Sequence, residues 1–370
     1  MKRMRYHRRR IILKNPARFL MMLLLLTGII CTAPALVSRF TGSRTDYSAL
    51  DSYIETGMKQ QKVPGLSLAL FQDKKILYSK AYGVKNSRTG EPVDENTVFQ
   101  AASFSKALTA YAALLLVDRG RLALDEPIHK YLKQPYLPKQ RFDDQITLRM
   151  ILNHTSGLSN DSDGKDRKIY FKPGALFSYS GAGFRYLQQV IEDVTDMPFA
   201  EFMEREIFTP LGMRSSSFVY KEELAPFMAT GHEAGKPFPI SRMPANAAYS
   251  LLTTPADMVK FNQELCRPRL VKPDTVAAML TPAVKWEKDI YWGLGIGILS
   301  TPAEDFFWHW GNNYYYCSMM ITGKDSKNGA VIMTNGNTGM WLAGRLAVKI
   351  LNDYFIGSDV IEPDKFSFTI

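Results

Sequence analysis

The chain has 370 residues, of which 46% are hydrophobic and 22% are charged, a composition typical of a globular protein. Its formal net charge is +10, but residues 1–45 hold ten basic and no acidic residues. The remainder has 36 basic and 36 acidic residues and is neutral, so the charge gives no support to nucleic-acid binding.

Residues 1–45 form the first predicted unit: a basic N-terminus, an apolar segment and a linker. The stretch 19–37 carries no charge over 19 residues, about the length that crosses a bilayer as a helix. The basic flank is expected to stay inside, so we predict one N-terminal anchor in the cell membrane, with the rest of the chain outside. A cleaved signal ending near Ala33-Pro34-Ala35 is the alternative, and the protein would then be secreted.

The remaining elements predict one α+β domain over residues 46–358, followed by a tail at 359–370. Strand signals lie at both ends, with a region rich in helix signals between them, at about 120–285. We therefore expect an antiparallel sheet built from both chain ends, flanked by helices, with an inserted, mostly helical lobe. In chain order, the pattern predicts a helix at 47–61, strands at 65–71 and 74–84, a buried helix at 103–119, strands near 291–299, 306–312, 317–323 and 329–336, and a helix at 338–354.

Ser103 and Lys106 stand at the start of the buried helix and share one helix face. The positive helix N-terminus and the loss of solvent both favour a neutral amine on Lys106. A neutral amine can take the proton of Ser103 and make it a nucleophile. The structural alternative is a serine N-cap beside a lysine that reaches the surface. A second pair at this spacing, Ser162 and Lys165, falls in a polar stretch that is predicted to be a solvated loop.

Other residues give no sign of a metal or cofactor site. The sequence has no Cys/His cluster with zinc spacing and no His-Glu-x-x-His motif, so we expect neither a metal nor a cofactor. Cys266 and Cys317 could pair, and the sequence does not decide between a disulfide and two thiols. Three histidines are scattered and predicted to be structural or surface groups: His129, His154 and His232.

Five motifs in order resemble the serine β-lactamase and penicillin-binding-protein superfamily, in its class C-like, β-lactamase-related branch, over about residues 47–355. They are Ser103-Phe104-Ser105-Lys106, ILNHTSGL at 151–158, Tyr179-Ser180-Gly181, IFTPLGMRSSSF at 207–218 and His309-Trp310-Gly311. The resemblance implies an extracytoplasmic serine hydrolase that forms an acyl-enzyme with an ester, an amide, a D-amino-acid peptide or a β-lactam. The alternative is a non-catalytic penicillin-binding-like module that recognises cell-wall peptide or a partner protein.

The resemblance also implies roles for individual residues. Ser103 would attack the substrate carbonyl, Lys106 would accept its proton, and Tyr179 would carry a proton to the leaving group. His309 and Gly311 match the place of the family's Lys-Thr-Gly strand and are expected to bind substrate. The backbone N–H groups of Ser103 and Asn312 would form the oxyanion hole. For His309, packing among the neighbouring aromatic residues is the structural alternative.

Two positions depart from the family's pattern. Gly181 replaces an asparagine whose amide holds the substrate's amide side chain, and His309 replaces a permanently charged lysine. Both changes favour an esterase or amidase with a broader acyl substrate over a β-lactamase or peptidase. Restoring asparagine and lysine is expected to improve β-lactam turnover, and protonation of His309 below about pH 6.5 is expected to favour carboxylate substrates.

Overall fold

A computed structural model describes residues 45–366, so the anchor predicted at residues 19–37 lies outside the described part of the chain. Within residues 45–366, no helix is both long and apolar enough to cross a membrane.

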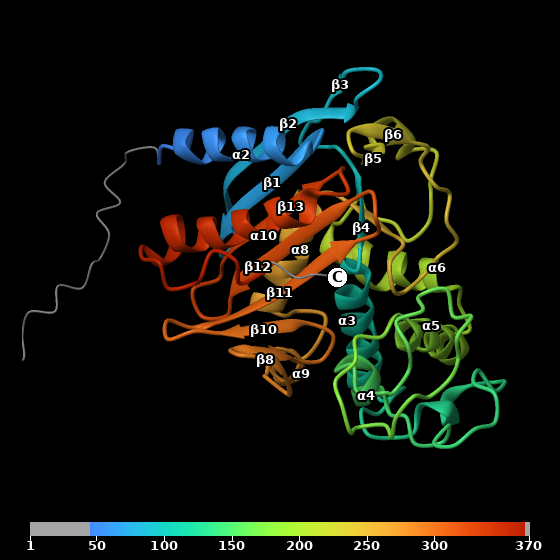
Figure 1. The fold of residues 1–370 in the computed structure, drawn as a ribbon. Coiled ribbons are helices and arrows are strands. Elements are labelled where there is room, and N and C mark those ends of the chain that lie inside the picture. The colour runs from blue at the N-terminus through green and yellow to red at the C-terminus, as the bar shows by residue number, and fades with distance from the viewer. Residues whose placement is uncertain (1–44, 367–370) are drawn as a thin grey trace, which may run out of the picture. The chain divides into compact units, whose positions relative to one another are not determined.

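A nine-stranded antiparallel sheet joins the two ends of the described chain (Figure 1). Its strand order is β3-β2-β1-β13-β12-β11-β10-β9-β8, with Leu68 of β1 facing Ile332 of β13. This topology confirms the α+β fold with a sheet built from both ends. The strands are β1 (Gly65–Gln72), β2 (Lys75–Asn86), β3 (Glu91–Pro92), β8 (Val284–Glu287), β9 (Ile290–Trp292), β10 (Gly297–Ser300), β11 (Asp305–Asn312), β12 (Cys317–Gly323) and β13 (Asn328–Thr334).

The central strands are buried on both faces because helices cover the sheet front and back (Figure 1). α2 (Ser48–Gln61) packs against α10 (Gly339–Ile350), where a Cβ at Gly57 would come within 2.4 Å of Leu342 Cδ1. α8 (Pro255–Cys266) packs against β1 and β13. The helical lobe was expected to extend to about residue 285. Within that range α8 packs on the sheet, and the edge strand β8 begins at Val284.

The helical part surrounds α3 (Phe104–Asp118), which is buried from Phe104 to Leu116. α3 contacts α5 (Gly181–Thr195) and also β4 and β11, so its first residue stands where the helices meet the sheet. The other elements are α4 (Leu148–Leu152), α6 (Phe199–Met203), α7 (Thr209–Leu211), α9 (Pro273–Met279), the short helical turns Ile128–Tyr131, Glu204–Phe208, Ala225–Phe227 and Leu351–Ile356, and two small sheets, β4 (Phe99–Ala102) with β7 (Leu251–Thr253) and β5 (Gly231–Glu233) with β6 (Lys236–Phe238).

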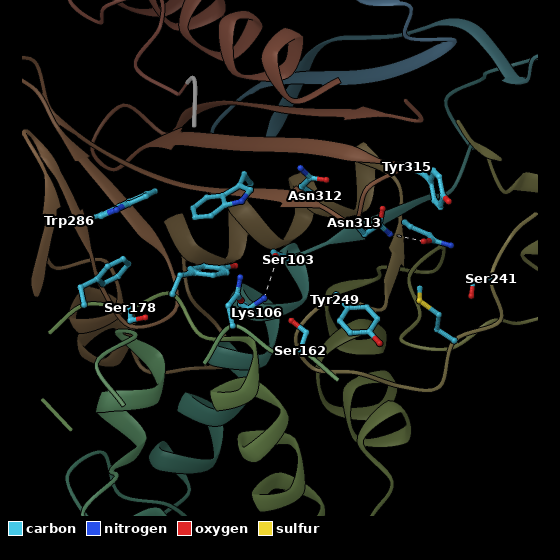
Figure 2. A pocket seen from close by; sticks show the side chains of 16 residues that line it. Ser103, Lys106, Ser162, Ser178, Ser241, Tyr249, Trp286, Asn312, Asn313 and Tyr315 are labelled. Atoms are coloured by element: carbon cyan, nitrogen blue, oxygen red, sulfur yellow. Dashed lines mark hydrogen bonds between the residues drawn. The ribbon is translucent and has the colours of Figure 1, made fainter. Parts of the chain in front are cut away.

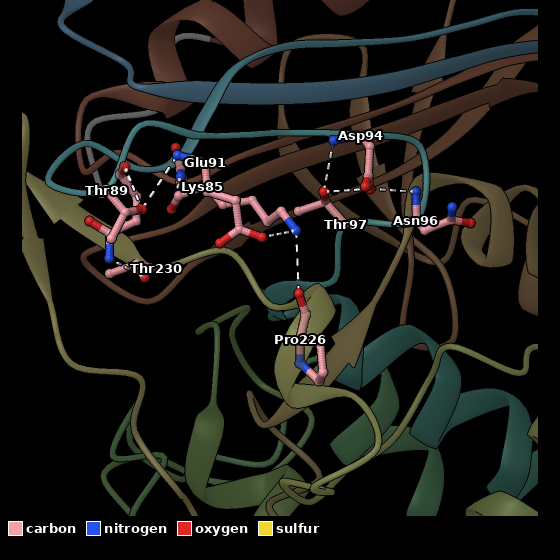
Figure 3. A network of polar contacts seen from close by, with 10 residues as sticks. Lys85, Thr89, Glu91, Asp94, Asn96, Thr97, Pro226 and Thr230 are labelled. Carbon is pink, nitrogen blue, oxygen red and sulfur yellow. Dashed lines mark hydrogen bonds and ion pairs between the residues drawn. The ribbon is translucent and has the colours of Figure 1, made fainter.

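A polar network fixes the chain just before β4 (Figure 3). Lys85 of β2 is 5% exposed, and its Nζ lies 2.6 Å from Glu91 Oε1 and donates to the Pro226 carbonyl at 3.3 Å. The next residue, Phe227, accepts a hydrogen bond from the Val98 N–H at 2.8 Å. Because a buried ammonium needs such partners, the network holds β2, residues 225–227 and the entry to β4 together.

Candidate functional site

Ser103 lies at the turn between β4 and α3 and lines a cavity of about 730 Å³. The preceding residue, Ala102, has φ of 47°, in the left-handed region that residues with a Cβ adopt only at a cost. Ser105 Oγ donates to the Ala102 carbonyl at 2.6 Å and accepts from the Leu251 N–H at 3.0 Å. These bonds hold the strained turn against β7 and direct Ser103 to the cavity.

Lys106 is 1% exposed, and its Nζ donates to Ser103 Oγ at 3.1 Å and to the Ala248 carbonyl at 2.9 Å. Burial lowers the pKa of Lys106 from 10.5 to about 7. The ring of Tyr179, centred 4.8 Å from Nζ, favours the ammonium instead, but desolvation is the larger effect. The alternative of a lysine that reaches the surface does not fit, because the side chain ends at the serine.

Tyr179 lies two residues before α5 and also lines the cavity. Its hydroxyl is buried and has no partner with standard hydrogen-bond geometry among residues 45–366, although Ser103 is near enough to lower its pKa. Burial is the stronger influence and raises the pKa of Tyr179 well above its ordinary value. The residue is therefore a neutral phenol at physiological pH.

Two buried histidines lie beside the Tyr179 ring, at centroid distances of 4.3 Å for His154 and 6.5 Å for His309. His154 Nδ1 accepts from the Ser180 N–H at 3.1 Å, so its proton is on Nε2. His309 Nδ1 lies 2.6 Å from the Trp310 carbonyl and carries the proton, so its Nε2 is a bare acceptor. Neither Nε2 has a partner in the described part of the chain.

His309 differs from the sequence expectation. It is 0% exposed and is not among the residues that line the cavity, so the geometry does not favour direct substrate contact. Burial lowers its pKa to about 3, which contradicts the expected protonation near pH 6.5. His154 was expected to be an ordinary structural or surface group. Its position in the ILNHTSGL motif was the one signal that linked it to the site.

Gly311 has a packing reason to be glycine, because a Cβ there would lie 2.2 Å from the Ala101 carbonyl oxygen. The glycine lets β4 approach β11 closely and so brings the turn at Ser103 up to the sheet. Asn312, the next residue, lines the cavity, and its Oδ1 accepts from the Tyr314 N–H at 2.9 Å.

The cavity has a volume of about 730 Å³ and two chemically different ends. Figure 2 shows Ser103 and Lys106 at its centre, with Trp286 on one side and Tyr249 and Tyr315 on the other. Lys106 is the only lysine, arginine, histidine or carboxylate among the described residues that line it. At the aromatic end Phe177 and Trp310 stack with Trp286. The other side has the polar side chains of Ser162, Ser241, Asn313 and Tyr315, and Asn313 is hydrogen-bonded to Gln100.

Trp286 and Phe177 were not predicted as site residues. Trp286 is on the edge strand β8, which the sequence pattern did not predict, and it stacks on Phe177 at 5.7 Å and on Trp310 at 5.7 Å. Trp310 itself also lines the cavity. The cavity thus has a flat aromatic surface on one side of Ser103.

Gly181 does not leave open space where the family has asparagine. A Cβ at this position would lie 2.1 Å from Ser162 Oγ and 2.9 Å from Ser162 Cα. Gly181→Asn, expected from the sequence to restore a substrate contact, therefore requires Ser162 to move. Ser162 lines the cavity, whereas Lys165 is 84% exposed and lies 3.7 Å from Asp163, so this pair is not a nucleophile with its base.

Cys266 and Cys317, which the sequence left undecided between a disulfide and two thiols, are free thiols in the structure. No group of three or more His, Cys, Asp and Glu side chains among residues 45–366 is placed to hold a metal ion.

Comparisons with known proteins agree on one family. A Beta-lactamase family model matches residues 50–353. A β-lactamase from Pseudomonas fluorescens is 31% identical over 240 residues (60% of this chain, 66% of the relative). Esterase EstB from Burkholderia gladioli is 29% identical over 222 residues (52% and 56%), and Protein flp from Staphylococcus aureus is 23% identical over 319 residues (78% and 63%). The matched part thus spans 56–66% of these relatives' own lengths.

A solved structure has the same fold. The octameric penicillin-binding protein homologue from Pyrococcus abyssi aligns with a TM-score of 0.77 and 24% identity, over 87% of this chain and 79% of that one.

Proposed function

This chain belongs to the β-lactamase family and is a serine hydrolase, and from this premise we propose that it hydrolyses neutral esters through an acyl-enzyme on Ser103. The hydrogen bond from Lys106 Nζ to Ser103 Oγ, made by a lysine that burial brings to a pKa of about 7, is the observation that carries the proposal. A lysine with an ordinary pKa would be almost wholly protonated near pH 7 and could not accept the serine proton.

In the first step, neutral Lys106 accepts the hydroxyl proton as Ser103 Oγ attacks the ester carbonyl carbon. The negative charge that develops on the carbonyl oxygen is received by the backbone N–H groups of Ser103 and Asn312. This assignment is supported by the positions of Ser103, on the turn before α3, and Asn312, at the end of β11, since both residues line the cavity. The C–O bond to the leaving group then breaks and the acyl-enzyme forms.

Tyr179 serves as the proton carrier to the leaving group. Its hydroxyl is near Ser103, and the Lys106 ammonium faces its ring, so the proton taken from the serine passes through the phenol to the departing alkoxide. In the second step a water attacks the acyl carbon, and its proton returns by the same groups, which releases the acid and restores Ser103 and neutral Lys106.

The cavity supports a neutral substrate. Lys106 is the only basic residue among the described residues that line it, and it is hydrogen-bonded to Ser103. A carboxylate therefore finds no permanent partner cation there, whereas the aromatic surface of Phe177, Trp286 and Trp310 suits an apolar acyl or alcohol group. These features favour an ester over a β-lactam or a D-amino-acid peptide.

The location is part of the proposal: a membrane-anchored enzyme with its hydrolase domain outside the cytoplasm. The basic residues that precede the uncharged stretch at 19–37 support this orientation. Protease added to intact spheroplasts should digest the domain. Digestion only after lysis would contradict the proposed orientation.

The test of the activity combines intact-mass spectrometry with kinetics. A fluorophosphonate should add one label to the wild type and none to Ser103→Ala, and a p-nitrophenyl ester should be hydrolysed only by the wild type. Ser358→Ala, an exposed serine far along the chain, is the matched control and should behave as the wild type. A Ser103→Ala variant that keeps its label or its activity would contradict the assignment. Stable labelling by a tagged penicillin in place of the fluorophosphonate would point to a penicillin-recognising site instead.

A further inference from the structure

The segment 159–163 lies against the Tyr179-Ser180-Gly181 motif, in the space that a side chain at position 181 would fill. The Gly181 N–H donates to Asn160 Oδ1 at 3.1 Å, and Ser180 Oγ donates to the Ser159 carbonyl at 2.8 Å. Ser162 packs so closely on Gly181 that a Cβ there would lie 2.1 Å from its Oγ. The segment is thus fixed relative to Tyr179, which precedes Ser180.

The same segment is also tied to the loop that holds Lys106. The Ser162 carbonyl accepts from Asn246 Nδ2 at 2.9 Å, and Asn246 Oδ1 accepts from the Ala248 N–H at 2.9 Å. Ala248 in turn accepts from Lys106 Nζ through its carbonyl. A continuous chain of hydrogen bonds therefore places Ser162 relative to the nucleophile's base, so its position at the cavity is a fixed feature of the site.

Two neutral polar groups of this segment remain available at the cavity. Ser162 is half-buried and lines the cavity, and its hydroxyl makes no hydrogen bond to another residue in the described range. Asn160 also lines the cavity, and because its Oδ1 receives Gly181, its NH₂ group is the part left to donate. Figure 2 shows Ser162 between Lys106 and Tyr249, at the rim opposite Trp286.

We propose that Ser162 and Asn160 form a substrate subsite that donates hydrogen bonds to a neutral polar group, such as an amide carbonyl, in the acyl part of the substrate. This inference rests on the proposed esterase function and assigns its specificity. The group that decides specificity comes from the 159–163 segment and not from position 181, where Gly181 has no side chain to offer.

The test compares two p-nitrophenyl esters of equal length. One has an N-acetylglycyl acyl group, and the other has a pentanoyl group in which methylenes replace the amide. Ser162→Ala should lower the ratio of kcat/KM for the amide ester to that for the pentanoyl ester by roughly 2- to 12-fold, the range expected for one neutral hydrogen bond. Asn160→Asp keeps the acceptor for Gly181 but removes the NH₂ donor, and it should lower the ratio as well.

Lys165→Ala is the matched control, since it alters the same loop at an exposed side chain, and its ratio should equal that of the wild type. Fluorophosphonate titration of Ser103 normalises every rate to the fraction of active enzyme. The subsite proposal is wrong if the kcat/KM ratio does not change in Ser162→Ala and Asn160→Asp, or if it falls equally in Lys165→Ala. In that case, labelling of Ser103 would still support the esterase function. A wild type that hydrolyses neither ester and takes no label overturns both.

Discussion

Replacing Lys106 by methionine should stabilise the protein near neutral pH while it removes ester hydrolysis. The folded protein holds Lys106 with a pKa of about 7, whereas an unfolded chain holds it at 10.5. Between these two pH values the unfolded state binds one proton more than the folded state, so stability rises with pH. The slope is about 1.4 kcal/mol per pH unit, and the cost of the buried lysine at pH 7 is therefore about 4 kcal/mol.

Methionine has a similar length and no charge, so the substitution removes this cost. It also removes the donor to the Ala248 carbonyl, and an unpaired buried carbonyl costs about 1–3 kcal/mol. The variant should then be more stable than the wild type by about 1–3 kcal/mol at pH 7. Because the lysine's cost vanishes as the pH approaches 10.5, the two stability curves should cross between about pH 8 and 10.

Urea unfolding of both proteins at several pH values between about 6 and 10 measures this difference. Lys165→Met, which alters an exposed lysine, is the control and should show no pH-dependent difference from the wild type. A Lys106→Met variant that is less stable than the wild type at pH 6, with a difference independent of pH, would show that Lys106 does not carry a lowered pKa. The argument that neutral Lys106 acts as the base would then be unsupported.

Other residues of the site give further expectations. Since neutral Lys106 is the base, kcat/KM for a neutral ester should rise with pH through about 7 with unit slope, and a profile flat from pH 5.5 to 8.5 would contradict this. Tyr179→Phe should lower kcat for the ester by roughly 10²- to 10⁴-fold, the usual contribution of a positioned proton carrier. Gly311→Ala places a Cβ 2.2 Å from the Ala101 carbonyl and should lower the free energy of unfolding by about 1–3 kcal/mol, measured by thermal or urea denaturation. The imidazole NMR signals of His309, whose pKa burial lowers to about 3, should not titrate between about pH 5 and 8.

The sequence predicted those parts of the site in which the residues lie close together along the chain. Ser103 and Lys106 are three residues apart at the start of one buried helix, so helix geometry alone brings them together. The strands at both chain ends were also predictable, because their apolar runs are long and are bounded by turn residues. The edge strand that carries Trp286 was missed, since it has only four residues with an alternating exposed and half-buried pattern.

What the sequence could not predict depends on contacts between distant segments. Ser162 appeared to be a loop serine because its neighbours are polar, and only its packing on Gly181 brings it to the cavity. His309 was expected to face the substrate because it belongs to the His309-Trp310-Gly311 motif. Successive side chains of a strand point to opposite faces, however, and His309 is buried while Trp310 lines the cavity. This burial lowers the pKa of His309.

The pairing of β1 with β13 has a consequence for how the protein is made on the ribosome. Leu66 pairs with Thr334 and Gln72 with Asn328, so the first strand of the sheet meets its central partner only after more than 250 further residues are synthesised. At about 5–20 residues per second, β1 and β2 wait for roughly 13–50 s as an unpaired hairpin with an apolar edge. Because β11 and β12 also arrive late, Ser103 is synthesised long before the sheet beside it exists. A nascent chain stalled before residue 305 should therefore bind an active-site probe poorly, however well its helices have formed. At that stage the unpaired edge of β1 is open to pairing with other chains.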